Sequence, residues 1–226
     1  MTTIVDSENI LLNINSPEKV YEFISEYTLE GKWNNVIMMY YEFPEAHTAI
    51  IPDSAGTALH VAIDLDEEIV VKELVNAILT HNNNVEVSDE RVKALEIDHR
   101  VEALEIGNER GDTPLHFAAS RGFAGICKSI IGNNKERIYL LGRKNKHGET
   151  PLFQAAINWR KQAFAYLAHI SQEIVDLQDL VRKDGDSILH TAIRGEYFGK
   201  LCYITCAYTR AGAHTHTYTH KYILYF

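Results

Sequence analysis

The sequence has few cysteines and no long apolar run. Its 226 residues include three cysteines, too few for the disulfide framework of a small secreted domain, and this fits a reducing compartment such as the cytosol. No apolar stretch reaches the roughly 18 to 20 residues that a membrane-spanning helix needs. The N-terminus lacks the basic start and apolar core of a secretory signal. We therefore expect a soluble, cytoplasmic protein from the chain as written.

Motifs that carry catalysis are also missing. The sequence contains no phosphate-binding glycine loop, no His-Glu-x-x-His pair and no serine elbow. Cys127 lies in an apolar stretch, where a cysteine is typically a small buried residue rather than a nucleophile. We therefore expect no enzymatic activity and no cofactor.

Charge is unevenly distributed along the chain. Residues 1–106 contain 6 Lys and Arg against 21 Asp and Glu, a net charge of −15, whereas residues 107–226 contain 16 against 10, a net charge of +6. Such asymmetry predicts partners that prefer one end of the molecule. Nucleic acid is a poor partner, because the whole chain is acidic at −9 and no aromatic stacking platform accompanies the lysines.

Four stretches of the sequence repeat one pattern, at residues 56–75, 112–131, 149–168 and 186–205. Each opens on a threonine or serine that can cap a helix, and in two copies a proline follows at the first helical position. The anchors and prolines are Thr57, Thr113, Thr150, Ser187, Pro114 and Pro151. A short helix is therefore predicted after each anchor.

Each of the first three repeats also predicts a second helix, antiparallel to the first, whereas the fourth repeat has Lys200 and Ile204 at the equivalent positions and is cut off halfway. A leucine and small residues follow the anchor, and apolar residues at spacing i, i+4 come 13 and 17 positions after it. These apolar positions are Val70 with Leu74, Ile126 with Ile130, and Ala163 with Leu167. Gly122 ends the first helix of the best copy, as a glycine after a helix C-terminus does.

Residues 108–133, NERGDTPLHFAASRGFAGICKSIIGN, resemble an ankyrin repeat in their Gly-x-Thr-Pro-Leu-His opening, Ala-Ala pair and glycine. The resemblance implies an all-α ankyrin-repeat solenoid of paired antiparallel helices. It also implies that His60, His116 and His190 are structural and bond neighbouring turns. The other copies depart from the pattern, with Asp66 and Trp159 for glycine and Phe153 for histidine.

The pattern suggests three segments. Residues 1–16 form an N-terminal extension, residues 17–199 the ankyrin-repeat domain with a capping repeat at 17–45, and residues 200–226 an atypical low-complexity tail. An insertion at about 82–107 contains the duplication RVKALEIDH, RVEALEIGN. It is either a tolerated surface loop or a dedicated partner-binding arm.

The tail offers an alternative function as a metal-binding protein. Its Cys202, Cys206, His216 and His220 are spaced C-x3-C-x9-H-x3-H, which resembles a zinc pattern whose middle spacer is normally about twelve. The stretch THTHTYTHKY also reads as a translated dinucleotide repeat, and Gly199-Lys200 is compatible with a splice-donor sequence. We therefore expect no metal site in the tail, and we hypothesise a retained intron in a truncated isoform.

We expect a non-catalytic protein-interaction module whose protein partner is of unknown identity. The partner is expected to bind at the loop tips and at the exposed side of each first helix. The predicted partner-binding residues are Asp53, Ser54, Asp64, Glu109, Arg110, Asp112, Ser120, Arg121, Lys144, Lys146, His147, Glu149, Asn158, Lys183, Asp186 and Arg194.

The stretches ALEIGNERGDTPLHFAASRG and DGDSILHTAIRGEYFG, together with the long acidic insertion, are similar to plant ankyrin-repeat proteins of the accelerated-cell-death type. In that family the repeats precede a membrane domain named for its Pro-Gly-Gly motif. The resemblance implies a role in plant defence or stress signalling, and full-length relatives at the plasma membrane. These 226 residues contain the repeats without the membrane domain.

Overall fold

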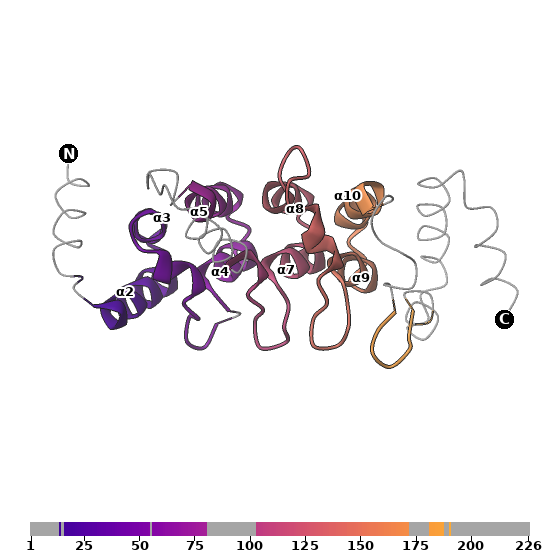
Figure 1. Cartoon of the computed structure of the whole chain (residues 1–226), viewed down its shortest axis with the longest axis horizontal. Helices are drawn as coiled ribbons and strands as arrows, with labels where there is room; N and C mark the ends of the chain where they lie inside the picture. Colours follow the sequence, from indigo (N-terminus) through magenta and orange to yellow (C-terminus); the bar gives the residue numbers. More distant parts are fainter. Residues whose placement is uncertain are drawn as a thin grey trace, which may run out of the picture. The chain divides into compact units, whose positions relative to one another are not determined.

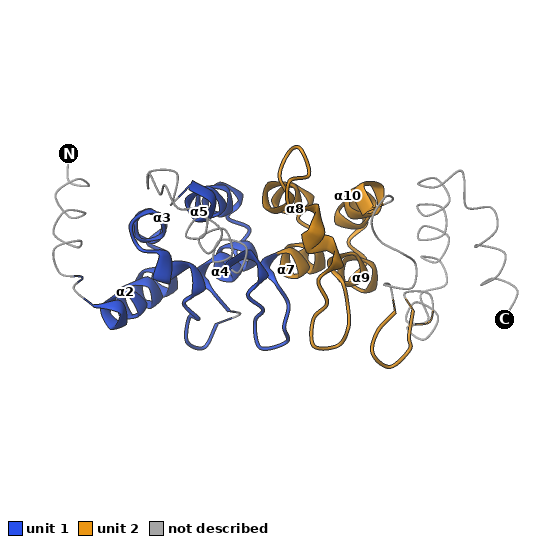
Figure 2. Cartoon of the chain, viewed as in Figure 1, with its two compact units in different colours: residues 1–114 blue, residues 115–226 orange. Residues whose placement is uncertain are grey.

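The computed structural model describes residues 14, 16–54, 56–80, 103–171, 181–187 and 190. The chain divides into two compact units, residues 1–114 and 115–226 (Figure 2). Within the described ranges, regular secondary structure is helical apart from two isolated antiparallel bridges, Ile50–Thr57 and Val181–Ser187. The all-α class expected from the sequence is confirmed.

The first unit is built from two helix pairs. The first pair is α2 (Pro17–Leu29) and α3 (Trp33–Glu42), followed by the short 3-10 helix η1 (Pro44–Thr48). The second pair is α4 (Ala58–Asp64) and α5 (Glu68–Thr80). Helix α2 contacts α4 while α3 contacts α5, so the first helices of the two pairs adjoin and so do the second helices (Figure 1).

The core of the first unit lies between these helices. Ile24, Met39 and Tyr40 are fully buried, and so is Leu74 of the predicted apolar stripe. Burial of such side chains stabilises each by roughly 1.5 to 3 kcal/mol. The two-helix rhythm predicted for residues 17–45 is confirmed, with Gly31 at φ 68° in the turn between α2 and α3.

The second unit repeats this construction. Its helices are α7 (Pro114–Arg121), α8 (Ala124–Ile131), α9 (Pro151–Ile157) and α10 (Lys161–Ser171), with the 3-10 helix η2 (Ile138–Gly142) between α8 and α9. Helix α10 contacts both α8 and α9. The stripe residues of α8 and α10 are buried as predicted, at Ile126, Ile130, Ala163 and Leu167.

Two polar side chains fix helix ends in the second unit. The Thr150 hydroxyl accepts a hydrogen bond from Phe153 N at 3.2 Å, the predicted N-cap of α9. Arg137 donates from Nε to Ile130 O at 2.6 Å and from Nη2 to Ser129 O at 3.2 Å. Arg137 therefore donates hydrogen bonds to carbonyls that the C-terminus of α8 would otherwise leave unpaired. Partial burial lowers the pKa of its guanidinium group.

The turn between paired helices needs a left-handed backbone whether or not the sequence supplies glycine. Gly122 has φ 92°, and the equivalent Asp66 and Trp159 both have φ 59°. A side chain in this region costs roughly 1 to 2 kcal/mol, less for aspartate. The two departures from the repeat pattern therefore retain its conformation at a cost in stability.

Asp66→Gly is expected to stabilise the first unit by about 0.5 to 1 kcal/mol, because glycine relieves the left-handed strain. Asp64→Gly, two residues earlier at the end of α4, is the matched control. There the same change should destabilise by about 0.5 to 1 kcal/mol, because the backbone is helical. Urea unfolding of both variants tests the pair, and a shift of the same sign in both would contradict this assignment.

Candidate functional site

A loop before α7 is held in shape by its own hydrogen bonds. The Asn108 side-chain oxygen accepts from Arg110 N at 2.9 Å and from Asp112 N at 3.0 Å. Asn108 N donates to Asp112 O at 3.0 Å, and Gly111 takes φ 76°. The turn is therefore fixed by the backbone and Asn108, which leaves Glu109 and Arg110 exposed.

The loop before α9 repeats the same turn. The Asn145 side-chain oxygen accepts from His147 N and Glu149 N, both at 2.9 Å. Asn145 N donates to Glu149 O at 3.0 Å, and Gly148 takes φ 81°. Lys144 and Lys146 are exposed on this loop. The repeat therefore presents different side chains on one loop framework.

His60 ties its own helix start to the following loop. Its Nε2 donates to Asp112 O at 3.0 Å, so the neutral ring accepts at Nδ1. Thr57 N donates to that nitrogen at 3.2 Å, and Thr57 Oγ1 lies 3.0 Å from it. A Cβ added to Gly56 would lie 3.0 Å from the ring. The ring is fully buried, which confirms the structural role predicted for it.

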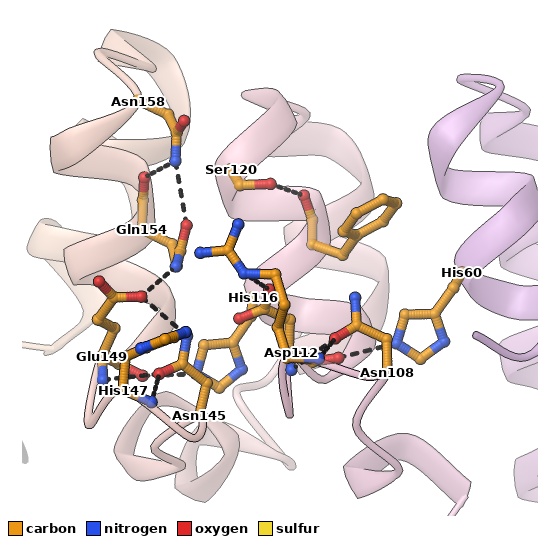
Figure 3. Close-up of polar contacts among 12 residues, drawn as sticks. His60, Asn108, Asp112, His116, Ser120, Asn145, His147, Glu149, Gln154 and Asn158 are labelled. Carbon is orange, nitrogen blue, oxygen red and sulfur yellow. Dashed lines mark hydrogen bonds and ion pairs between the residues drawn. The ribbon is translucent and has the colours of Figure 1, made fainter. Parts of the chain in front are cut away.

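His116 makes the equivalent bond in the second unit. Its Nε2 donates to Glu149 O at 2.9 Å (Figure 3), and the ring is fully buried. At His190, the ring Nδ1 lies 2.8 Å from the Ser187 hydroxyl. This contact of His190 is with its own anchor residue. His60 and His116 thus join a helix start to the following turn, as predicted, and burial of both rings leaves no access for a substrate.

The third repeat has Phe153 where the others have this histidine. In that repeat, the loop before α9 contains a buried carboxylate, Glu149. Glu149 Oε2 accepts from Gln154 Nε2 at 2.6 Å and from Asn145 Nδ2 at 2.9 Å. Its Oε1 lies 3.3 Å from Arg182 Nε. Figure 3 shows the bonds of Glu149 to Gln154 and Asn145, and Glu149 is 2% exposed. Glu149 therefore links its own loop to α9 and to residue 182.

The loop before residue 187 also bonds directly to the loop before α9. Lys183 N donates to His147 O at 3.0 Å. Arg182 N donates to Asp186 O at 2.9 Å, and Asp184 Oδ1 accepts from Asp186 N at 3.1 Å. The two loops are thus joined through a main-chain bond and a charge pair.

Most of the predicted partner-binding residues lie at the surface. The exposed ones are Asp53, Asp64, Glu109, Arg110, Arg121, Lys144, Lys146, His147, Asn158 and Lys183, while Ser54 and Ser120 are half-buried. Ser120 donates to Phe117 O at 2.8 Å, and Ser120 O accepts from Arg160 Nε at 2.8 Å. Arg194 lies outside the described residues.

Three predicted surface residues are instead buried, which corrects the expectation that they face a partner. Asp112, Glu149 and Asp186 are 6%, 2% and 9% exposed. Each immediately precedes an anchor residue, and its main-chain carbonyl accepts the hydrogen bond that closes the turn. The Asp112 carboxylate lies 3.6 Å from Arg110 Nε. Burial at this position follows from the turn rather than from the residue type.

Sequence reasoning missed the residues that support the loops. Asn108 and Asn145 each stand five positions before an anchor, a recurrence visible in the sequence. Asparagine is favoured there because its side chain can bond main-chain groups two and four residues ahead. Gln154 and Arg182 carry no such repeating signal, because they act only where histidine is replaced by Phe153.

The described residues include one cysteine, Cys127. Cys127 is buried, as predicted, and burial raises the pKa of its thiol from 9.0 to about 12, so it stays protonated at neutral pH. The described ranges hold no group of three or more potential metal ligands. Cys202, Cys206, His216 and His220 lie outside those ranges, as do the duplication and the tail. Among the described helices, none has the length and apolarity to cross a membrane.

The family match agrees with this geometry. Residues 85–176 match the family model for ankyrin repeats in three copies. A search of curated proteins gives no match. Among solved structures, the chain is similar to the crystal structure of the ankyrin repeat domain of Bcl-3, described as a unique member of the IkappaB protein family. The identity is 17% over 84% of this chain and 85% of that chain, with a TM-score of 0.37. The chain contains ankyrin repeats within residues 85–176, and its fold is the all-α ankyrin-repeat fold.

Proposed function

We propose that this protein is a non-catalytic scaffold that binds another protein through the tips of its repeat loops. Ankyrin repeats are typically protein-interaction modules. The observation that carries the proposal is the pair of matching turns at Asn108 and Asn145, each held by two bonds to one amide side chain. A preformed loop binds without paying the entropy of ordering.

The two turns are held by the same main-chain and asparagine bonds but carry different side chains at their tips. At the tips, Glu109 and Arg110 in one loop correspond to Lys146 and His147 in the other. The two loops share one main-chain conformation, while the charge and shape of their tip side chains differ. A surface that recognises specific partners needs this combination. A role in plant defence or stress signalling, and a cytoplasmic location, remain predictions from the sequence.

Site-specific photo-crosslinking tests the proposal. A photoreactive amino acid is placed in the full chain at Glu109 or Lys146 on the loops, and at exposed Lys128 or Ala165 on α8 or α10 as controls. We expect defined adducts with other proteins from the loop positions and few from the control positions. Adducts confined to the control positions, or none from any position, would contradict the proposal.

A further inference from the structure

The described part of the second unit carries an excess of positive charge. Its described residues include 11 Lys and Arg against 4 Asp and Glu, whereas those of the first unit include 4 against 15. Two of the four acids, Glu149 and Asp186, are buried. The exposed acids in the described part of the second unit are Glu136 and Asp184.

This excess of positive charge is concentrated on two joined loops, residues 143–147 and 182–184, which we name the basic loop pair. Lys144, Lys146 and Lys183 are all exposed on it. The main-chain bond from Lys183 N to His147 O, 3.0 Å long, holds the two loops together. Three ammonium groups therefore belong to one fixed surface.

The fold itself separates the charges of the basic loop pair. The Glu149 carboxylate is turned inward, where it accepts two hydrogen bonds and faces Arg182. Asp186 is 9% exposed, and Asp184 lies 3.7 Å from Arg182 Nε. Glu149 and Asp186 are thus buried, Asp184 stays exposed beside Arg182, and Lys144, Lys146 and Lys183 are exposed. The arrangement is particular to these loops, because Asp53 and Glu109 occupy the exposed tips in the first unit.

We infer that the basic loop pair binds an acidic segment of a partner protein, rich in aspartate or glutamate. The inference deepens the proposed scaffold function and rests on it. Charge complementarity at fixed positions speeds association and selects the partner. Each exposed charge pair contributes about 0.2 to 1 kcal/mol, so three lysines together support a weak, salt-sensitive contact.

An acidic protein segment fits the molecule better than a nucleic acid does. The described residues of the first unit carry a net charge of −11 and the whole chain −9, so a long polyanion that reaches the first unit is repelled there. The basic loop pair also has no Phe, Tyr or Trp, the side chains on which unpaired bases stack. A short acidic segment needs to contact only the lysines.

The test measures binding of a labelled oligoglutamate peptide to the full chain by fluorescence anisotropy. In the test variant, Lys144, Lys146 and Lys183 are all changed to glutamate. In the control, Lys128, Lys135 and Lys161 are changed instead, which gives the same net charge on the same unit. We expect the test variant to bind at least about 10-fold more weakly and the control less than about 3-fold more weakly. Binding should also weaken as salt rises from about 50 to 300 mM.

Three results would overturn the inference: no peptide binding by the unaltered chain, equal weakening in the two variants, or tighter binding of a single-stranded oligonucleotide or an anionic vesicle than of the peptide. Matched thermal unfolding of both variants confirms that the charge changes leave the fold intact.

Photo-crosslinking distinguishes failure of the acidic-partner inference from failure of the proposed scaffold function. Loop adducts that persist without peptide binding leave the scaffold function standing and reject the acidic partner, whereas absence of adducts from every position rejects the scaffold function.

Discussion

Glu149→Ala is expected to lower the free energy of unfolding of the second unit by about 3 to 5 kcal/mol. The change removes the acceptor of hydrogen bonds from Asn145 and Gln154, at 2.9 and 2.6 Å. It also removes the charge 3.3 Å from Arg182 Nε, a side chain 27% exposed. A partly buried cation and two amide groups would lose their shared partner, and each loss carries a desolvation cost.

The two tryptophans make this measurement specific to one unit. Trp33 lies in α3 of the first unit and Trp159 lies between α9 and α10 of the second. In a Trp33→Phe background, fluorescence during urea unfolding reports on Trp159 alone. Glu136→Ala, which removes an exposed carboxylate from the same unit, is the control and should change stability by less than about 0.5 kcal/mol.

Glu149→Gln separates charge from hydrogen bonding. The amide keeps one acceptor oxygen but adds a donor among groups that already donate, so an intermediate loss of about 2 kcal/mol is expected. If Glu149→Ala and Glu136→Ala destabilise the second unit equally, the buried carboxylate does not join the two loops energetically.

Glu149 also shows where sequence reasoning ended. The repeat pattern predicted the helices, their buried stripes and the histidine bonds, because each depends on residues at fixed spacing within one repeat or its neighbour. The burial of Glu149 depends on Asn145, Gln154 and Arg182, which come from three segments. From the sequence alone, a charged loop residue such as Glu149 is expected to be exposed. Its burial becomes visible only once the turn and its neighbours are assembled.

The turns between paired helices keep their conformation when the glycine of the repeat pattern is replaced. Asp66 and Trp159 read as departures from glycine, yet the backbone keeps the left-handed turn at both. Tertiary packing of the paired helices outweighs a local cost of roughly 1 to 2 kcal/mol. A mismatch to the repeat pattern therefore indicates lower stability at that turn rather than a different fold.

His60→Ala is expected to destabilise the first unit by about 3 to 5 kcal/mol, through a cavity and through the loss of one hydrogen bond at each of two main-chain groups. The ring is fully buried and serves both Asp112 O and Thr57 N, at 3.0 and 3.2 Å. Urea unfolding in a Trp159→Phe background follows Trp33 and therefore the first unit. Asp64→Ala, an exposed change on the same helix, should cost less than about 0.5 kcal/mol.

His60→Phe then divides the effect into packing and hydrogen bonding. Phenylalanine fills the ring site but pairs with neither main-chain group, so a loss of about 1 to 3 kcal/mol should remain. The third repeat carries Phe153 at this position and has the Glu149 carboxylate contacts and the Lys183 N–His147 O bond beside it. The first unit has apolar Ala55 and Gly56 before its anchor and no matching carboxylate there, so it cannot compensate in this way. A His60→Phe variant as stable as the unaltered chain would mean that packing alone, and not the bond to the following turn, sets the histidine at this position.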